Sequence, residues 1–331
     1  MTRRRSIVGF AQSLAVCTGV MHGCAMSSEV EPAPLVETAV QAQVVWAGGT
    51  QPSLKGAYWL KLDDNYGTVS VNDNRRVAWN LETPAFGGFD AAGVAALNTN
   101  YQIQTLVRIG DSTSARPSAA DIAALSGGSF NCAQLSAAWT NALDAEAALV
   151  NAAITANPGS IGAFIFSNEP NIGAPLAPSG WGISGSAYAR AYNCYLAHWK
   201  AGAKSGYPLL VAGPGGCNNT DPRINVPGCS NFYTGFFSQL GATVDGFTIH
   251  AYGSTNFAAG ADTQGFVDQA TRINQSKPGR PIYITEFAVG GNQSPATGWG
   301  DYFNQRFAEV RTYNQTHAGQ IKALIFFVDA L

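Results

Sequence analysis

The chain has 331 residues, of which 46% are hydrophobic and 12% are charged, so it has ample apolar side chains for a core and too little charge for an extended disordered region. Its 19 basic and 21 acidic residues give a net charge of −2, and neither sign forms a long run after the first few residues. This balance argues against a basic surface for nucleic acid. We therefore expect a globular protein that binds no nucleic acid.

The amino terminus has the pattern of an export signal. Three arginines at positions 3–5 precede a mostly apolar stretch over residues 7–21, which is too short to span a bilayer stably. Two processing sites compete, because the segment ending in Cys24 resembles a bacterial lipobox and ordinary signal cleavage nearby is the alternative. We predict a signal over residues 1–23, a tether over residues 24–43, and a secreted or cell-surface protein that contacts a membrane only through a lipid on Cys24.

Short apolar runs alternate with longer amphipathic stretches from about residue 44 onward. Six runs are predicted strands because they are short, rich in β-branched or aromatic residues and bounded by Gly or Pro: residues 104–109, 161–167, 208–212, 244–250, 281–285 and 321–328. Segments at 58–62 and 77–81 are the expected first two strands. Helical patterns lie at residues 132–156, 186–205, 230–240, 263–275 and 302–315.

Eight strands that alternate with helices predict an α/β protein with a (β/α)8 TIM barrel, in a single domain over residues 44–331. A doubly wound open sheet is the alternative, and it is disfavoured because no GxGxxG turn follows an early strand. The sequence ends at Leu331, directly after the eighth predicted strand, so we expect the closing eighth helix to be absent. We expect a monomer.

Four cysteines lie beyond the predicted signal region, and an even number in an exported chain predicts disulfides. Cys217 and Cys229 bracket a loop rich in Pro, Gly and Asn, so we pair them with each other. Cys132 would then pair with Cys194 and tie two helical segments together. Zinc is the alternative, but no CxxC motif or paired histidines accompany these cysteines, so we predict no metal site.

Two glutamates follow predicted strands on opposite sides of the barrel. In this fold the reacting groups lie at the carboxyl ends of the strands, where Glu169 follows the fourth strand and Glu286 the seventh. Glycoside hydrolysis needs such a pair, because one carboxyl protonates the leaving oxygen while the other attacks the sugar or activates water. The sequence therefore predicts a glycosidase site across the barrel mouth, with no cofactor.

Three motifs at predicted strand ends resemble the clan A retaining glycoside hydrolases, the cellulase-like (β/α)8 barrel superfamily. They are SNEPN at residues 167–171, IHAY at residues 249–252 and ITEF at residues 284–287, and the resemblance covers about residues 104–328. It implies that Glu169 is the general acid/base and Glu286 the nucleophile. The same resemblance implies a substrate-binding role for Asn168, His250, Tyr252 and Arg108.

Each of these roles has a chemical meaning. The resemblance implies that Asn168 binds the sugar 2-hydroxyl and that Tyr252 holds the nucleophile ionised, with His250 in the same subsite. Arg108 either lies near the nucleophile or pairs with Asp111 or Asp63. A cation beside Glu286 would stabilise its ionised form, whereas Glu169 facing that anion would keep its proton more readily. We predict a carboxyl separation of about 5 Å, the distance of retaining enzymes.

Two tryptophans stand in glycine-rich loops after the fourth and seventh strands. Trp181 and Trp299 would each stack on a sugar ring or, in the alternative, anchor its loop to the barrel. We assign both to substrate binding. We expect a secreted or cell-surface retaining hydrolase that acts internally on a β-linked polysaccharide or oligosaccharide. An exo-acting β-glycosidase and a barrel that binds carbohydrate without turnover are the alternatives.

Overall fold

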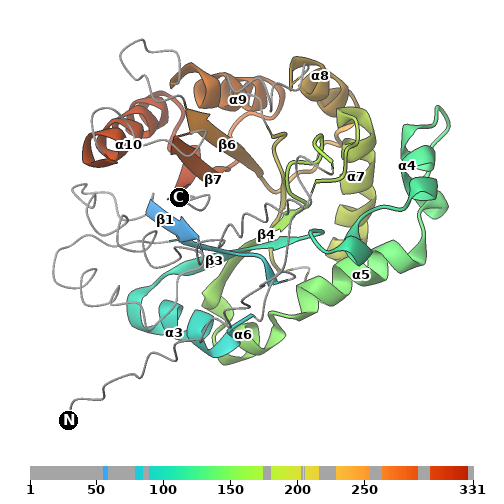
Figure 1. Cartoon of the computed structure of the whole chain (residues 1–331), viewed down its shortest axis with the longest axis horizontal. Coiled ribbons are helices and arrows are strands. Elements are labelled where there is room, and N and C mark those ends of the chain that lie inside the picture. The colour runs from blue at the N-terminus through green and yellow to red at the C-terminus, as the bar shows by residue number, and fades with distance from the viewer. Residues whose placement is uncertain are drawn as a thin grey trace, which may run out of the picture. The chain divides into compact units, whose positions relative to one another are not determined.

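Parallel strands close into a barrel in the computed structural model of the protein (Figure 1). The structure describes residues 55–58, 79–84, 89–173, 180–202, 204, 206–215, 229–253, 263–289 and 299–326, and all of them belong to one compact unit, Leu35–Leu331. The described strands are β1 (Lys55–Tyr58), β2 (Trp79–Glu82), β3 (Gln104–Ile109), β4 (Ile161–Phe166), β5 (Leu209–Val211), β6 (Phe247–Gly253), β7 (Ile282–Val289) and β8 (Ile321–Phe326). Each strand pairs with the next, and β8 pairs with β1. The predicted (β/α)8 barrel is confirmed.

Helices surround this barrel and connect its strands (Figure 1). They are α3 (Ala91–Tyr101), α4 (Ala119–Ser126), α5 (Ala137–Ala148), α6 (Asn151–Ala156), α7 (Gly185–Ala201), α8 (Cys229–Gln239), α9 (Thr263–Ser276) and α10 (Trp299–Thr316), with short 3-10 turns η3 (Thr113–Ala115), η4 (Cys132–Gln134) and η5 (Pro158–Ser160). None of the described helices is both long and apolar enough to cross a lipid bilayer. The predicted signal and tether lie outside the described residues.

Several predicted boundaries are wrong. The first strand begins at Lys55 instead of residue 58, and the helix predicted over residues 132–156 is divided into η4, α5 and α6. Strand β6 runs from Phe247 to Gly253 instead of over residues 244–250, and the Asp245 carboxylate before it accepts a hydrogen bond from the Leu209 backbone N–H (2.9 Å). Helices α3 and α4 were not predicted, because their alanine-rich sequences give a weak helical periodicity.

An aromatic layer between the barrel and its helices fixes the end of β4. The ring of Phe166 stacks on Tyr188 and Tyr195 of α7, and Trp139 of α5 meets it edge-on. The buried Tyr188 hydroxyl donates to the Phe166 carbonyl (2.5 Å) and accepts from the Ala212 N–H (2.8 Å). The ends of β4 and β5 are therefore held in one position by a single phenol.

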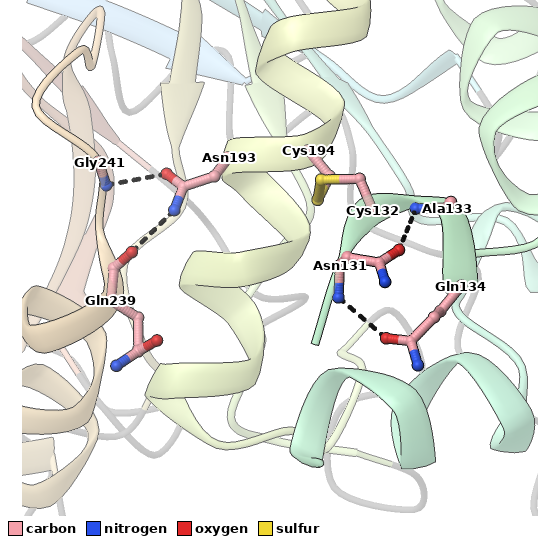
Figure 2. The surroundings of a disulfide bond; sticks show 8 residues. All are labelled: Asn131, Cys132, Ala133, Gln134, Asn193, Cys194, Gln239 and Gly241. Atoms are coloured by element: carbon pink, nitrogen blue, oxygen red, sulfur yellow. Dashed lines mark hydrogen bonds between the residues drawn. A yellow bond between two sulfur atoms is a disulfide. The ribbon is translucent and has the colours of Figure 1, made fainter. Parts of the chain in front are cut away.

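A disulfide joins η4 to α7 on the outside of the barrel (Figure 2). Cys132 and Cys194 are bonded, with their Cα atoms 5.5 Å apart, so this predicted pair is confirmed. Asn131 caps η4 beside it, and Asn193 connects α7 to the end of α8 through the Gln239 carbonyl (2.7 Å) and the Gly241 N–H (3.0 Å). The pairing of Cys217 with Cys229 stays a prediction, because Cys217 and the Cys229 side chain lie outside the described residues.

We predict that the double substitution Cys132→Ser/Cys194→Ser lowers the melting temperature by roughly 10 °C. The bond closes a loop with a sequence separation of 62, which the chain-entropy model values at about 4 kcal/mol. Thermal unfolding under oxidising conditions measures the shift, and an unchanged midpoint would contradict it. A further decrease when reductant is added to the double variant would reveal a second disulfide, as expected for Cys217 and Cys229.

Candidate active site

The turn after β4 presents Glu169 to the barrel mouth in an uncommon backbone conformation. Ser167 and Glu169 both have positive φ angles, 75° and 42°, which non-glycine residues rarely adopt and which cluster at functional sites. Hydrogen bonds hold the turn, because the Ser167 N–H donates to the Ile109 carbonyl (2.7 Å) and the Ile172 N–H to the Glu169 carbonyl (2.9 Å). The backbone therefore fixes where the Glu169 side chain begins.

A bulge in β7 brings Glu286 opposite His250. The register passes from Ile249 opposite Ile284 to His250 opposite Glu286, so Thr285 is an extra residue in β7. Such an extra residue changes which side chains face a given side of the sheet. Without the bulge, His250 would stand opposite Thr285, and Glu286 would lie one position further along.

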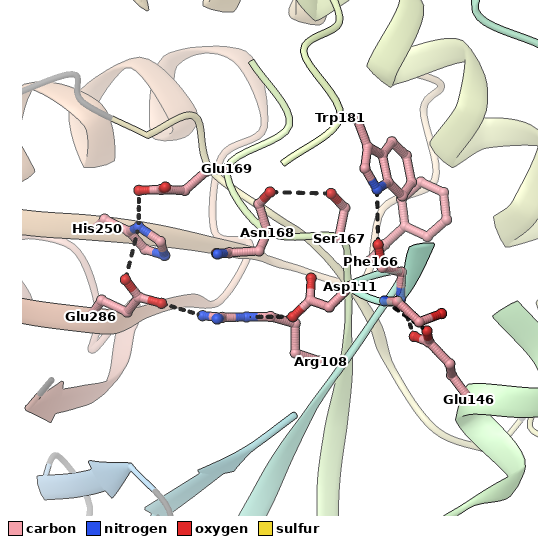
Figure 3. Close-up of polar contacts among 12 residues, drawn as sticks. Arg108, Asp111, Glu146, Phe166, Ser167, Asn168, Glu169, Trp181, His250 and Glu286 are labelled. Carbon is pink, nitrogen blue, oxygen red and sulfur yellow. Dashed lines mark hydrogen bonds and ion pairs between the residues drawn. The ribbon is translucent and has the colours of Figure 1, made fainter. Parts of the chain in front are cut away.

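The two glutamates meet around the imidazole of His250 (Figure 3). Nδ1 of His250 lies 3.0 Å from Oε1 of Glu169 and 3.4 Å from Oε2 of Glu286. One carboxylate oxygen of each glutamate and a ring nitrogen of His250 all lie within 4.8 Å of one another. The pair predicted from strands four and seven is therefore brought together across the barrel mouth.

Arg108 binds the other oxygen of Glu286. Its Nη2 lies 2.5 Å from Oε1 of Glu286, while its Nε lies 4.0 Å from Oδ2 of Asp111. Both arginine and glutamate are buried, with 3% and 4% of their surfaces exposed. Arg108 thus contacts both of the partners proposed for it among the described residues, and Glu286 is much the closer one. Asp63, the third, lies outside the described residues.

The two carboxylates set the charge of the His250 imidazole, and a residue of α9 fixes its backbone. Burial by itself lowers the pKa of the imidazole, but the charge of Glu286 and the hydrogen bond and charge of Glu169 outweigh it, so the pKa is raised. The His250 carbonyl accepts from Nε2 of Gln269 (3.0 Å), and Gln269 in turn accepts from the Tyr233 hydroxyl (2.8 Å). The cationic form is favoured because the ring stands between two carboxylates.

Together, Glu169, His250 and Glu286 also offer oxygen and nitrogen donors of the kind that bind metal ions. Arg108 already supplies a buried positive charge 2.5 Å from Glu286. A divalent ion beside the same carboxylate would meet that charge at short range. The charge of Arg108 therefore makes this donor set a poor match for a divalent metal ion.

The remaining predicted site residues are two tryptophans, Asn168 and Tyr252. Trp181 is 6% exposed, donates from Nε1 to the Gly110 carbonyl (2.9 Å) and packs edge-on against Trp139 and Phe166, so its prediction as a sugar platform is wrong and it anchors the loop. The reason is that its ring fills the aromatic layer under the turn. Asn168 is 8% exposed and lies in the turn beside Glu169 (Figure 3). The side chains of Tyr252 and Trp299 lie outside the described residues.

A glycine and an asparagine near Glu169 were missed by the sequence analysis. A Cβ on Gly215 would lie 2.4 Å from Cδ of Glu169, so only glycine leaves room for that carboxyl. Asn171 holds Gly215 in place, donating to its carbonyl (3.0 Å) and accepting from its N–H (2.7 Å). The available sequence signals were the final Asn of SNEPN and the closely spaced glycines after strand five. Only the folded barrel brings that asparagine and Gly215 together.

The chain belongs to the glycosyl hydrolase catalytic core family, whose model matches residues 128–327, and it is therefore a glycoside hydrolase. The motifs, the family and the barrel together confirm the predicted relationship to the clan A barrels. No curated protein matches the chain.

Solved structures with a similar fold include an endo-β-1,4-mannanase double mutant from Cellulomonas fimi, with a TM-score of 0.51 and 15% identity over 88% of this chain and 68% of that one. A curdlan-specific exo-β-1,3-glucanase from Blastomyces gilchristii has a TM-score of 0.45 and 17% identity over 84% and 91%. An endo-β-1,3-glucanase from Sorangium cellulosum has a TM-score of 0.45 and 16% identity over 84% and 90%.

We predict that Gly215→Ala lowers kcat for glycoside hydrolysis by about 100-fold with little change in melting temperature. The new methyl group would displace the end of the Glu169 side chain, which costs little stability but moves the carboxyl by about 1 Å, and such a displacement costs about 100-fold in rate. Gly128→Ala is the matched control, because nothing lies within 4 Å of its Cβ position. Wild-type kcat in Gly215→Ala would contradict the crowding.

Proposed function

We propose that the protein is a retaining glycoside hydrolase that cleaves a β-linked polysaccharide internally, with Glu286 as nucleophile and Glu169 as general acid/base. The carboxylate separation carries the proposal. The facing oxygens of Glu169 and Glu286 are at most 4.8 Å apart. Retaining enzymes hold their carboxyls about 5–5.5 Å apart, whereas inverting enzymes need about 6.5–9.5 Å to admit a water molecule.

The first half of the reaction forms a covalent bond between the sugar and Glu286. The ion pair with Arg108 favours the ionised carboxylate that a nucleophile requires. Glu286 attacks the anomeric carbon, while Glu169 transfers its proton to the departing glycosidic oxygen. The bond to the leaving sugar breaks as the bond to Glu286 forms.

The second half returns both carboxyls to their starting forms. Glu169, now ionised, takes a proton from water, and the resulting oxygen nucleophile attacks the anomeric carbon and releases Glu286. His250 contacts both carboxyls, so its positive charge compensates whichever of them is ionised at each stage. In this proposal Asn168 binds the sugar 2-hydroxyl, and Tyr252 supports the nucleophile.

The proposed substrate class is supported by a solved structure with a similar fold. The Cellulomonas fimi barrel with a similar fold is an endo-β-1,4-mannanase. We favour internal cleavage of a β-linked chain, with Trp299 as a sugar platform, over an exo-acting β-glycosidase. A barrel that only binds carbohydrate would have no need for a paired, charge-compensated carboxyl site. We also propose that the protein acts as an exported monomer, with the signal and tether described above and with lipid on Cys24 as one of its two processing outcomes.

We predict that Glu286→Gln lowers kcat by at least about 1,000-fold, because the amide cannot form the glycosyl ester. Glu169→Gln should lose comparable activity on a polysaccharide but retain glycosylation of a 2,4-dinitrophenyl β-glycoside, whose leaving group departs without a proton. Asp144→Asn on α5 is the control, because this carboxyl hydrogen-bonds Tyr195 and His198 outside the site, and it should keep wild-type kcat. Full activity in Glu286→Gln would refute the nucleophile assignment, and equal losses on both substrates in Glu169→Gln would refute the acid/base assignment.

We predict that the first product released has the anomeric configuration of the substrate. Two displacements at one carbon restore its configuration, whereas one displacement inverts it. Proton NMR of the newly formed reducing end, recorded before mutarotation, distinguishes the β-anomer from the α-anomer.

A panel of β-1,3- and β-1,4-linked glucans and mannans, with product lengths recorded, identifies the linkage. Long intermediate products indicate internal cleavage, and a single short product from the start would overturn it.

A further inference from the structure

Asp111 is a fully buried carboxyl beside the site, and the mechanism above gives it no role. It lies two residues beyond the end of β3, with no exposed surface, and its Oδ2 is 4.0 Å from Nε of Arg108. Among the described residues, no group donates a hydrogen bond to either carboxyl oxygen. A buried ionised carboxylate without donors is costly, so this position calls for a structural explanation.

The chain holds Asp111 in place through its neighbours. The buried Glu146 of α5 accepts from the Gly110 N–H (2.5 Å) and the Ser112 N–H (2.9 Å), the two backbone groups on either side of Asp111. Trp181 donates to the Gly110 carbonyl (2.9 Å), and Nη2 of Arg116 donates to the Asp111 carbonyl (3.2 Å). Four hydrogen bonds therefore fix the backbone that directs the Asp111 side chain toward Arg108 (Figure 3).

Four charged groups surround Asp111 in the described part of the chain, namely Arg108 of β3, Arg116 of the following loop, Glu146 of α5 and Glu286 of β7. Burial is the largest influence and raises the pKa of Asp111 to about 8, with Glu146 and Glu286 adding to the rise and the two arginines opposing it. At neutral pH this carboxyl is therefore protonated and uncharged. It contacts Arg108 without competing for its charge.

We propose that Asp111 is a positioning residue for the nucleophile Glu286. The neutral carboxyl of Asp111 packs against Arg108 on the side away from Glu286, so the guanidinium charge stays directed at Glu286. Figure 3 shows Arg108 between the two carboxyls. Once ionised, Asp111 would compete with Glu286 for the same guanidinium. The inference rests on the proposed function, because it acts through the nucleophile assigned there.

The activity test compares Asp111→Asn with the wild type. Asparagine is uncharged at every pH and has nearly the shape of the protonated acid. The substrate is a 2,4-dinitrophenyl β-glycoside of the sugar that the polysaccharide panel identifies, which removes the proton donation by Glu169 from the first step. We expect the ratio of kcat/KM in Asp111→Asn to that in the wild type to rise about tenfold from pH 6 to pH 9, because about a tenth of a carboxyl stays protonated one unit above its pKa.

Asp144→Asn of α5 is the matched control, because this partly exposed aspartate hydrogen-bonds Tyr195 and His198 of α7, which are not part of the site. Its ratio to the wild type should not change with pH. A merely structural role for Asp111 would lower kcat/KM equally at all pH values, and this flat ratio would overturn the proposal. If Asp111→Asn does not fold, the kcat/KM of the wild type is measured over the same range, and a value that stays constant from pH 6 to pH 9 would overturn the proposal.

A stability measurement tests the charge state without any substrate. Between pH 3.8, the ordinary pKa of an aspartate, and about pH 8, the folded protein binds one more proton at Asp111 than the unfolded chain does. Wild-type stability relative to Asp111→Asn therefore falls as the pH rises through this range and is constant above it. Melting temperatures at pH 4, 6, 8 and 9 measure this, and a constant difference would overturn the neutral carboxyl. If the wild type cleaves no glycoside, the proposed function fails, whereas this measurement still decides whether Asp111 is held neutral.

Discussion

The site depends on charges that are buried in alternating sign. Arg108, Glu286 and His250 are buried and alternate in sign, and the partly exposed Glu169 contacts His250 at the end of this series. Removing one partner from a buried pair costs about 3–5 kcal/mol, because the remaining charge is left in a medium that solvates it poorly. The ends of β3, β4, β6 and β7 must therefore stay in register with one another, or these charges lose their partners. A closed barrel supplies that register.

Much of the surrounding structure serves this constraint. The extra residue in β7 places Glu286 opposite His250, and the positive φ angles of Ser167 and Glu169 bring the acid/base candidate to the same point. Strained backbone of this kind persists only where neighbouring contacts determine it. Here those contacts include the Tyr188 hydroxyl between β4 and β5 and the Asn171 clamp on Gly215.

Features that follow from local periodicity and chemical type could be predicted from the sequence. Strand β3 was predicted with its observed bounds, and the two glutamates were recognised because each follows an apolar run and belongs to a short motif. The Cys132–Cys194 bond was found by elimination among four cysteines. Trp181 was placed incorrectly because a tryptophan in a glycine-rich loop has the same sequence pattern whether its ring faces solvent or the core.

The amino-acid sequence by itself determined the barrel class and the identity of the paired carboxyls, because strand periodicity and the residues at strand ends are local properties of the chain. Only the tertiary structure decided the β7 bulge, the contact of Gly215 with Glu169 and the neutral state expected of Asp111. These depend on atoms from separate strands, and burial, which controls the protonation of Asp111, arises only when α5, β3 and the Trp181 loop pack together. For this reason an aspartate that looks ordinary in the sequence becomes a candidate for tuning the nucleophile in the fold.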